Sequence, residues 1–252
     1  WNCRFDAALL NYDESYEGTQ IHSAHFRAYL KATAQGWVDA LDPNIGSILE
    51  VDCGQGEFLA LLADITPARL TGCDPAYRGD GDARFAIHPR VLSAADAQAH
   101  DVVINRMTLE HVAEPDDFMR QMAACVAPDG CLITQIPNAA RMIDKALFCD
   151  LIFEHVNYFN ATAITRLLQR LGFASNRCVL SYDDQHLTVF SYRAPGRFAA
   201  PEPPETPALS RFQANAAAFG NTWHDRLSDF AAKGHAIYVW VFNDTATTEI
   251  YT

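Results

Sequence analysis

Residues 48–63 read ILEVDCGQGEFLALLA, which joins two kinds of local pattern through a pair of glycines. The apolar run that ends at Val51 is typical of a buried strand, and the apolar spacing from Phe58 is helical. Between them, Gly54 and Gly56 carry no side chain, so backbone amides at the start of the helix can approach a ligand closely. The stretch predicts a strand, a tight glycine turn and a helix, which is the first unit of an α/β fold.

On both sides of this unit, apolar runs alternate with helical patterns. Strands are expected at 70–73, 102–105 and 131–136, and helices are expected over 23–41, from 115 and over 160–171, with Ser23 and Asn160 as N-caps. Such alternation produces right-handed crossovers and a mainly parallel, doubly wound sheet whose ligands lie at the carboxyl ends of the strands. Two later runs, 177–182 and 186–192, predict an antiparallel pair that closes the sheet.

Composition predicts a division of the chain into five parts. Residues 1–22 form a polar N-terminal segment that could close over a cleft as a lid, and 23–193 form the main domain. Residues 194–207 carry five prolines and are expected to be an extended linker. Residues 208–241 hold one helix and one strand, too little for a core of their own. Residues 242–252 are polar and without apolar periodicity, and we expect them not to belong to the native protein.

The bulk composition excludes several classes of partner. The net charge is −12 and no Lys/Arg-rich run is present, so nucleic acid is not an expected partner. No apolar stretch approaches the roughly 20 residues that span a bilayer, so no membrane association is expected. The seven cysteines are scattered without a CxxC pair, which favours a reducing, cytoplasmic location. No His, Cys, Asp and Glu spacing matches a metal site, and the oligomeric state stays open.

The residues around the glycine turn favour a positively charged ligand. A dinucleotide fingerprint would require a third glycine where the chain has Leu59. Glu50, Asp52 and Glu57 flank the turn, and a carboxylate about 4 Å from a phosphate would cost roughly 4 kcal/mol. S-adenosylmethionine instead offers a sulfonium and an ammonium group. Asp74 ends the second strand, where nucleoside-binding folds place the carboxylate that binds ribose hydroxyls.

Three segments resemble motifs of the class I S-adenosylmethionine-dependent methyltransferases. ILEVDCGQGEF resembles their first motif, GCDPAYRG the second, and DVVINRMTLEHV the segment after the fourth strand. One departure is Asp52, where the family usually has the first glycine of an E-x-G-x-G-x-G pattern. The resemblance implies a Rossmann-like methyltransferase fold. The residues that it implies for cofactor binding are Glu50, Asp52, Gly54, Gly56, Asp74, Pro75 and Arg106.

A further segment resembles a narrower bacterial group, the C-methyltransferases of nucleotide-linked 4-keto-deoxysugars and their relatives. LIFEHVNYFNATAITRLLQRLGF, residues 151–173, carries this resemblance, together with residues 12–23, 135–138 and 234–241. Members of the group have an N-terminal zinc module, so the resemblance implies a chain truncated at both ends. They commonly have a tyrosine just before the Glu-His pair, whereas this chain has Ile152 and Phe153.

This resemblance implies methyl transfer to a small-molecule acceptor. His155 is the candidate base that removes a proton from the carbon next to a ketone, and the adjacent Glu154 orients a substrate hydroxyl or supports the charged imidazole. The candidate acceptor-binding residues are Tyr12, Tyr16, Asn138 and Tyr158. A nucleotide-linked sugar is the acceptor that the resemblance favours.

Other interpretations stay open. The acceptor atom could be oxygen or nitrogen, the domain could be a scaffold that has lost catalysis, or the chain could be a nicotinamide oxidoreductase. His155 and Glu154 could also serve only to hydrogen-bond a loop to the sheet. His111 belongs to a second Glu-His pair, in TLEHV, which we expect to support the cofactor pocket. Titration with S-adenosylmethionine and with NAD(P) separates three classes of protein. A methyltransferase should bind S-adenosylmethionine, an oxidoreductase should bind NAD(P), and a scaffold that has lost catalysis should bind neither.

Overall fold

The computed structural model describes residues 2, 5–6, 22–93, 96–97, 100–152, 154–196 and 209–236. The chain divides into two compact units. The described residues between 22 and 140 and from 154 to 196 belong to the first unit, and residues 141–152 and 209–236 belong to the second. The sequence analysis places residues 141–152 in its main domain, so the second unit includes a segment that composition did not separate.

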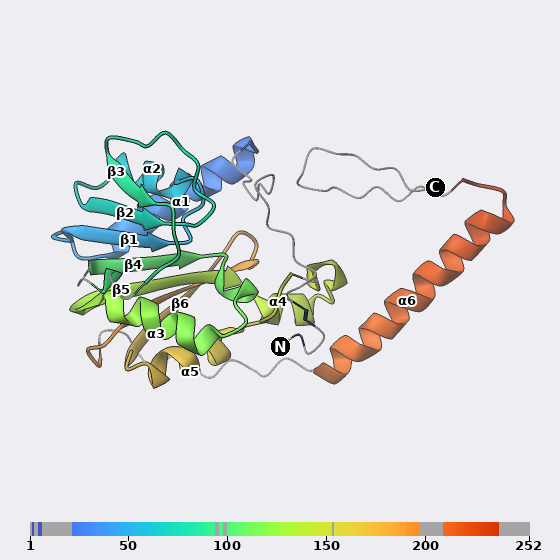
Figure 1. Ribbon diagram of the computed structural model, residues 1–252. Coiled ribbons are helices and arrows are strands. Elements are labelled where there is room, and N and C mark those ends of the chain that lie inside the picture. Colours follow the sequence, from blue (N-terminus) through green and yellow to red (C-terminus); the bar gives the residue numbers. More distant parts are fainter. Residues whose placement is uncertain are drawn as a thin grey trace. The chain divides into compact units, whose positions relative to one another are not determined.

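Within the described residues, seven strands form one sheet in the order β3-β2-β1-β4-β5-β7-β6 (Figure 1). Strands β1 to β5 run parallel, and β7 is antiparallel to both of its neighbours, β5 and β6. The strands are β1 (Ser47–Val51), β2 (Arg69–Cys73), β3 (Phe85–His88), β4 (His100–Arg106), β5 (Val126–Pro137), β6 (Ser175–Ser181) and β7 (His186–Tyr192). This topology confirms the predicted parallel sheet with an antiparallel closing pair.

Capping side chains fix where two of the helices begin. The Ser23 hydroxyl accepts a hydrogen bond from the Phe26 amide at 3.2 Å, and Oδ1 of Asn160 accepts one from the Ala163 amide at 2.9 Å. Gly172, at φ +87°, follows the end of the second of these helices. The described helices are α1 (Ala24–Ala40), α2 (Glu57–Ala63), α3 (Pro115–Cys125), α4 (Ala139–Asp144), α5 (Ala161–Arg170), α6 (Leu209–Ala232), and the 3-10 turns η3 (Leu109–His111) and η4 (Phe148–Asp150).

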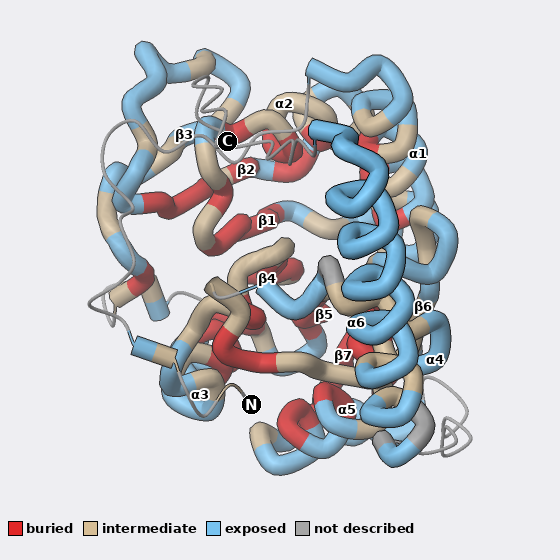
Figure 2. The backbone as a smooth tube through the Cα atoms, turned by 90° about the vertical axis from the view of Figure 1, so that its right-hand side faces the viewer, coloured by how far each residue is buried: buried red, intermediate tan, exposed pale blue. Residues whose placement is uncertain are grey.

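The sheet of the first unit has a buried core on each face (Figure 2). Successive residues of β1 alternate between the cores, because side chains along a strand point to opposite faces. Ile48 packs with Trp37 of α1 and with residues of α2, whereas Leu49 packs in the core that holds Met122 of α3 and Leu168 of α5. Helices α1 and α2 therefore cover one face of the sheet, and α3 and α5 cover the other (Figure 1).

The carboxyl ends of the parallel strands meet along one edge of the sheet. Val51 pairs with Cys73 on one side and with Asn105 on the other, and Arg106 pairs with Gln135. The antiparallel strand β7 begins at the same edge, because His186 is opposite Pro137. The loops that follow β1, β2, β4 and β5 therefore emerge side by side, as the alternation of strands and helices predicts.

The second unit contains the long helix α6 and the segment that includes η4. The ring of Phe148 lies 5.0 Å from that of Phe212 and 5.1 Å from that of Phe219, measured between centroids. Helix α6 confirms the helix expected within residues 208–241. For the strand expected in the same segment, residues 233–236 are not in a strand, and residues 237–241 lie outside the described residues. The linker beyond 196 and the tail 242–252 also lie outside them.

Two described elements of the first unit differ from the sequence analysis. Strand β3 (Phe85–His88) is not predicted, and β5 begins five residues earlier than the expected start at Cys131. Among the described residues, no helix combines the length and the apolar character needed to cross a bilayer.

Candidate active site

The turn between β1 and α2 requires left-handed backbone at three positions. Asp52, Gly54 and Gly56 have φ values of +52°, +58° and +87°. A Cβ added to Gly56 would lie 2.6 Å from Cδ1 of Ile87, so a side chain at this position would require Ile87 to move. Aspartate tolerates the left-handed region better than most residues. Asp52 therefore keeps the backbone conformation that a glycine would adopt at this position of the motif.

Asp74 holds the glycine turn against the end of β2. Its Oδ2 accepts a hydrogen bond from the Gly54 amide at 2.7 Å, and its Oδ1 accepts one from the Ala76 amide at 2.7 Å. The side chain of Gln55 forms a second bridge, donating to the Ala76 carbonyl at 2.9 Å and accepting from the Arg78 amide at 3.0 Å. Each carboxylate oxygen can accept more than one hydrogen bond, so Asp74 can both brace the turn and bind a ligand hydroxyl.

Beneath the turn lies a buried carboxyl group with an unused oxygen. Glu50 is 2% exposed, and its Oε2 has no hydrogen-bond partner among the described residues. Its Oε1 lies 3.9 Å from Nη1 of Arg106. Burial raises the pKa of Glu50 to about 8, and Arg106 only partly opposes this. Burial and the charge of Asp74 likewise raise the pKa of Asp52 to about 7.

These carboxyl groups make the turn suitable for a cation. The charge of Asp74 raises the pKa of both Glu50 and Asp52, and a positively charged ligand would relieve this repulsion. The turn also offers glycines that let a ligand approach the backbone. Both features fit the amino and sulfonium groups of S-adenosylmethionine, and an anionic pyrophosphate would fit poorly.

Arg106 connects the turn to a polar chain that crosses the strand ends. Its guanidinium lies 4.1 Å from the centroid of the Phe58 ring, and its Nε donates to Oε1 of Gln135 at 3.1 Å. Nε2 of Gln135 is 3.3 Å from the Tyr29 hydroxyl, which in turn lies 2.8 Å from Nδ1 of His186. Gln135, Tyr29 and His186 are not among the site residues that the sequence analysis proposes. Gln135 lies in residues 135–138, which carry part of the resemblance, and this is the sequence signal that could have identified it.

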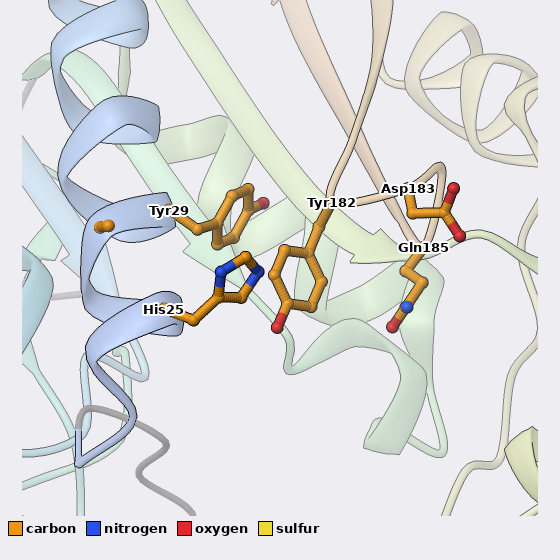
Figure 3. Close-up of a pocket in the computed structure, with 6 residues that line it drawn as sticks. His25, Tyr29, Tyr182, Asp183 and Gln185 are labelled. Carbon is orange, nitrogen blue, oxygen red and sulfur yellow. The ribbon is translucent and has the colours of Figure 1, made fainter.

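Tyr29 of this polar chain also lines an aromatic pocket of about 580 Å³ (Figure 3). His25 and Tyr29 of α1 turn their rings toward Tyr182, and the rings of Tyr29 and Tyr182 lie 4.6 Å apart. Tyr182, Asp183 and Asp184 form the tip of the β6–β7 hairpin, with φ values of +54°, +52° and +60°. Left-handed backbone at successive non-glycine residues is costly and is found preferentially at functional sites.

Two Glu-His pairs that are far apart in the sequence form one cluster. Glu110 and His111 lie on η3, and His155 lies in the loop before α5. The rings of His111 and His155 are nearly perpendicular, with centroids 4.9 Å apart. The backbone fixes this arrangement, because the amides of Val156 and Asn157 both donate to the Glu110 carbonyl, at 2.7 and 3.0 Å. We call Glu110, His111 and His155 the Glu-His cluster.

Glu154 contacts this cluster through its backbone. Its carbonyl oxygen lies 3.2 Å from Nδ1 of His111, so the direct partner of Glu154 is His111. Burial, followed by the nearby His111, lowers the pKa of His155 to about 4. His155 is therefore neutral at neutral pH and has a lone pair that can accept a proton. The ring of Tyr158 lies 5.9 Å from that of His155, which keeps Tyr158 beside the candidate base.

Other predicted site residues have different environments. Nδ2 of Asn138 donates to the Asp184 carbonyl at 3.0 Å, and its Oδ1 accepts from the Ala140 amide at 3.2 Å. Asn138 therefore braces the hairpin tip against the start of α4. Pro75 lies in the turn that follows Asp74. Tyr12 and Tyr16 lie outside the described residues.

No spacing along the sequence predicts a metal site, but the fold brings three possible ligand residues together. The possible ligand atoms of Glu110, His111 and His155 all lie within 4.8 Å of one another. Their sequence separation matches no metal motif, because the cluster depends on a loop that returns to η3.

A comparison with protein families identifies the first unit. Residues 24–177 match the model of a methyltransferase domain, which is more than half of the chain. A probable S-adenosylmethionine-dependent methyltransferase from Mycolicibacterium smegmatis is 29% identical over 135 residues, which cover 50% of this chain and 51% of that protein. The chain thus spans about half the length of this relative.

Solved structures share the fold at lower sequence identity. An O-methyltransferase family protein from Burkholderia thailandensis has a TM-score of 0.53 and 19% identity, over 68% of this chain and 59% of that one. The 1,6-didemethyltoxoflavin-N1-methyltransferase of the same organism, solved with its acceptor and S-adenosylhomocysteine, has a TM-score of 0.52 and 14% identity, over 67% and 80% of the two chains. At the level of the family, these comparisons confirm the predicted cofactor, S-adenosylmethionine. The chain belongs to the methyltransferase domain family, with a Rossmann-like α/β fold.

Proposed function

We propose that this chain transfers a methyl group from S-adenosylmethionine to a small molecule, and that His155 removes the proton from the accepting atom. One observation carries the proposal: two different features share one edge of the sheet. The first is the acidic glycine turn, where Glu50 has a buried oxygen without a hydrogen-bond partner among the described residues, and the second is the Glu-His cluster. The first feature suits a cationic cofactor and the second suits proton transfer.

On the cofactor side, Asp74 would accept hydrogen bonds from the ribose hydroxyls while continuing to hold the Gly54 amide. Glu50 and Asp52 would face the positive charge of the cofactor, and Pro75 and Arg106 would complete the site. When bound, S-adenosylmethionine supplies a methyl group whose bond to sulfur breaks, returning its electron pair to sulfur, as the acceptor atom bonds to the methyl carbon.

On the acceptor side, the favoured acceptor is a carbon next to a ketone in a nucleotide-linked deoxysugar. His155 would take the proton from that carbon, and the electron pair left behind would attack the methyl group. Neutral His155 has a lone pair that can accept the proton, while its lowered pKa makes it a weaker base than a free imidazole. Tyr158 lies beside His155 and would contact the acceptor.

The aromatic pocket would bind the flat part of such an acceptor. Its rings come from His25, Tyr29 and Tyr182, and aromatic faces favour stacking on a planar group such as a nucleobase. Asn138 would act indirectly, by holding the hairpin that carries Tyr182. Tyr12 and Tyr16 remain candidates for contacts from the N-terminal segment.

Two alternatives follow from the same site. A base in the position of His155 could equally take a proton from oxygen or nitrogen, and the solved structures of similar fold include O- and N-methyltransferases. A domain that binds neither S-adenosylmethionine nor NAD(P) would be a scaffold that has lost catalysis. The product identifies the accepting atom, and cofactor titration identifies the scaffold.

Proton exchange tests the role of His155 without requiring methyl transfer. With S-adenosylhomocysteine in the site, the parent protein should exchange the α-proton of a nucleotide-linked 4-keto-deoxysugar with deuterated water. His155→Ala should abolish this exchange and lower turnover by roughly 10²- to 10⁴-fold. Exchange at the parental rate in His155→Ala would remove this histidine from the mechanism. Methylation of oxygen or nitrogen without exchange would support the alternative acceptors.

A further inference from the structure

The Glu-His cluster contains a buried carboxyl oxygen that no group in the described residues satisfies. Glu110 is 3% exposed, and its Oε2 has no hydrogen-bond partner there. Leaving such an oxygen unpaired in the interior costs free energy, and a proton or a cation would satisfy it. The nitrogen atoms of His111 and His155 that could serve as ligands lie within 4.8 Å of a carboxyl oxygen of Glu110 and of each other.

The two histidines are prepared to act as ligands. Nδ1 of His111 lies 3.2 Å from the carbonyl oxygen of Glu154, and a ring N–H that donates to a carbonyl leaves a lone pair on the other nitrogen. Metal-bound histidines in proteins are oriented in this way. Both rings are only partly buried, so solvent can reach them.

We propose that Glu110, His111 and His155 form a binding site for a divalent transition-metal ion of the Zn²⁺ type. Two imidazoles and one carboxylate are a common ligand set for such ions, whereas Mg²⁺ and Ca²⁺ prefer oxygen ligands alone. Ligand atoms about 2.1 Å from a tetrahedral ion lie roughly 3.3 Å apart. Small rotations of the side chains would therefore close the cluster on the ion, leaving a position for water or another ligand.

The site goes beyond the proposed function but shares His155 with it. A lone pair on an imidazole nitrogen cannot hold a metal ion and take a proton at the same time. Bound metal would thus inhibit a reaction in which His155 is the base, and a chelator would restore it. Metal binding itself requires neither cofactor nor acceptor, so the two proposals can fail separately.

Equilibrium dialysis with Zn²⁺ tests the site directly. The full chain, freed of any histidine tag and stripped with a chelator, should bind one Zn²⁺ ion at the cluster. Glu110→Gln and His111→Gln should each weaken this binding by about 100-fold or more, since even the loss of a supporting partner costs 10- to 100-fold. His88→Gln, which changes an exposed histidine on β3, is the matched control and should bind as the parent does.

Two further measurements make the result decisive. Circular dichroism checks that each variant is folded, and the visible absorption of bound Co²⁺ reports nitrogen and oxygen ligation in the parent and its loss in the variants. Failure of the parent to bind Zn²⁺, or equal binding by the parent, Glu110→Gln and His111→Gln, would overturn the proposal. Zn²⁺ binding without inhibition of methyl transfer would leave the metal site standing and contradict the role of His155 as the base.

Discussion

Gly54 and Gly56 both adopt left-handed backbone, but only Gly56 is also confined by its neighbours. A Cβ at Gly56 would lie 2.6 Å from Ile87, whereas the nearest atom to a Cβ at Gly54 is 3.7 Å away. Left-handed backbone costs an alanine about 1–2 kcal/mol at either position. We therefore expect Gly56→Ala to lower the free energy of unfolding more than Gly54→Ala does, as measured by urea denaturation. Equal losses would show that packing around the turn adjusts freely.

Glu50 makes the stability of the ligand-free protein depend on pH. Its folded-state pKa, about 8, is above its ordinary value of 4.5, so the folded protein retains a proton that the unfolded chain releases. The resulting stabilisation is complete below pH 4.5 and is lost as the pH rises through 8. Asp52 acts in the same direction, with a folded-state pKa of about 7.

We expect the free energy of unfolding to fall by on the order of 1 kcal/mol or more between about pH 5 and about pH 9. Glu50→Gln should remove the part of this decline that Glu50 causes, because the amide has no proton to lose. Urea denaturation of both proteins across this range measures the effect. If the free energy of unfolding falls as steeply with pH in Glu50→Gln as in the parent, Glu50 does not cause the decline.

Single residues differ in how far the sequence predicts them. The positions of Glu50 and Asp74 at strand ends follow from local patterns. The hydrogen bond from the Gly54 amide to Asp74 does not, because it depends on the distance between two loops in space. Asp52 departs from the motif and yet has left-handed backbone, which glycine adopts readily and aspartate tolerates.

Among the elements, α5 depends on one capping side chain. Oδ1 of Asn160 accepts the Ala163 amide at 2.9 Å, and the helix buries Ile164 and Leu168 against the sheet. Asn160→Ala should therefore lower the free energy of unfolding by about 1 kcal/mol. Asn160→Ser, which keeps an oxygen at the cap, should lose much less. Thermal or urea unfolding of both variants measures the difference, and equal losses would indicate that the cap contributes little.

The elements that are predicted well have strong local signals. Helices α1 and α5 combine capping residues with helical apolar spacing, and β1 is a short apolar run before a glycine turn. Strand β3 has only four residues and alternates between intermediate and exposed positions at the sheet edge, so its apolar run, residues 85–87, is too short to mark a strand. The beginning of β5 contains Pro128 and Gly130, which disguise a strand that pairing with β4 nevertheless forms.

In the whole molecule, the candidate site is assembled by contacts between distant segments. The Glu-His cluster joins His111 to His155 because the loop before α5 returns to η3. The polar chain from Arg106 to His186 crosses β4, β5, α1 and β7. No local sequence pattern marks the Glu-His cluster or the polar chain. The sequence therefore predicts the edge of the sheet and the cofactor side of the site, but not which distant side chains meet there.

The proposed mechanism divides the carboxyl edge of the sheet into a cofactor side at Asp74 and an acceptor side at His155. Calorimetric titration of S-adenosylmethionine into the metal-free parent, Asp74→Ala and His155→Ala tests that division most directly. The parent should bind, Asp74→Ala should bind more weakly by about 1.5–3 kcal/mol, and His155→Ala should bind as the parent does. No binding by the parent, or equal weakening in both variants, would contradict the account.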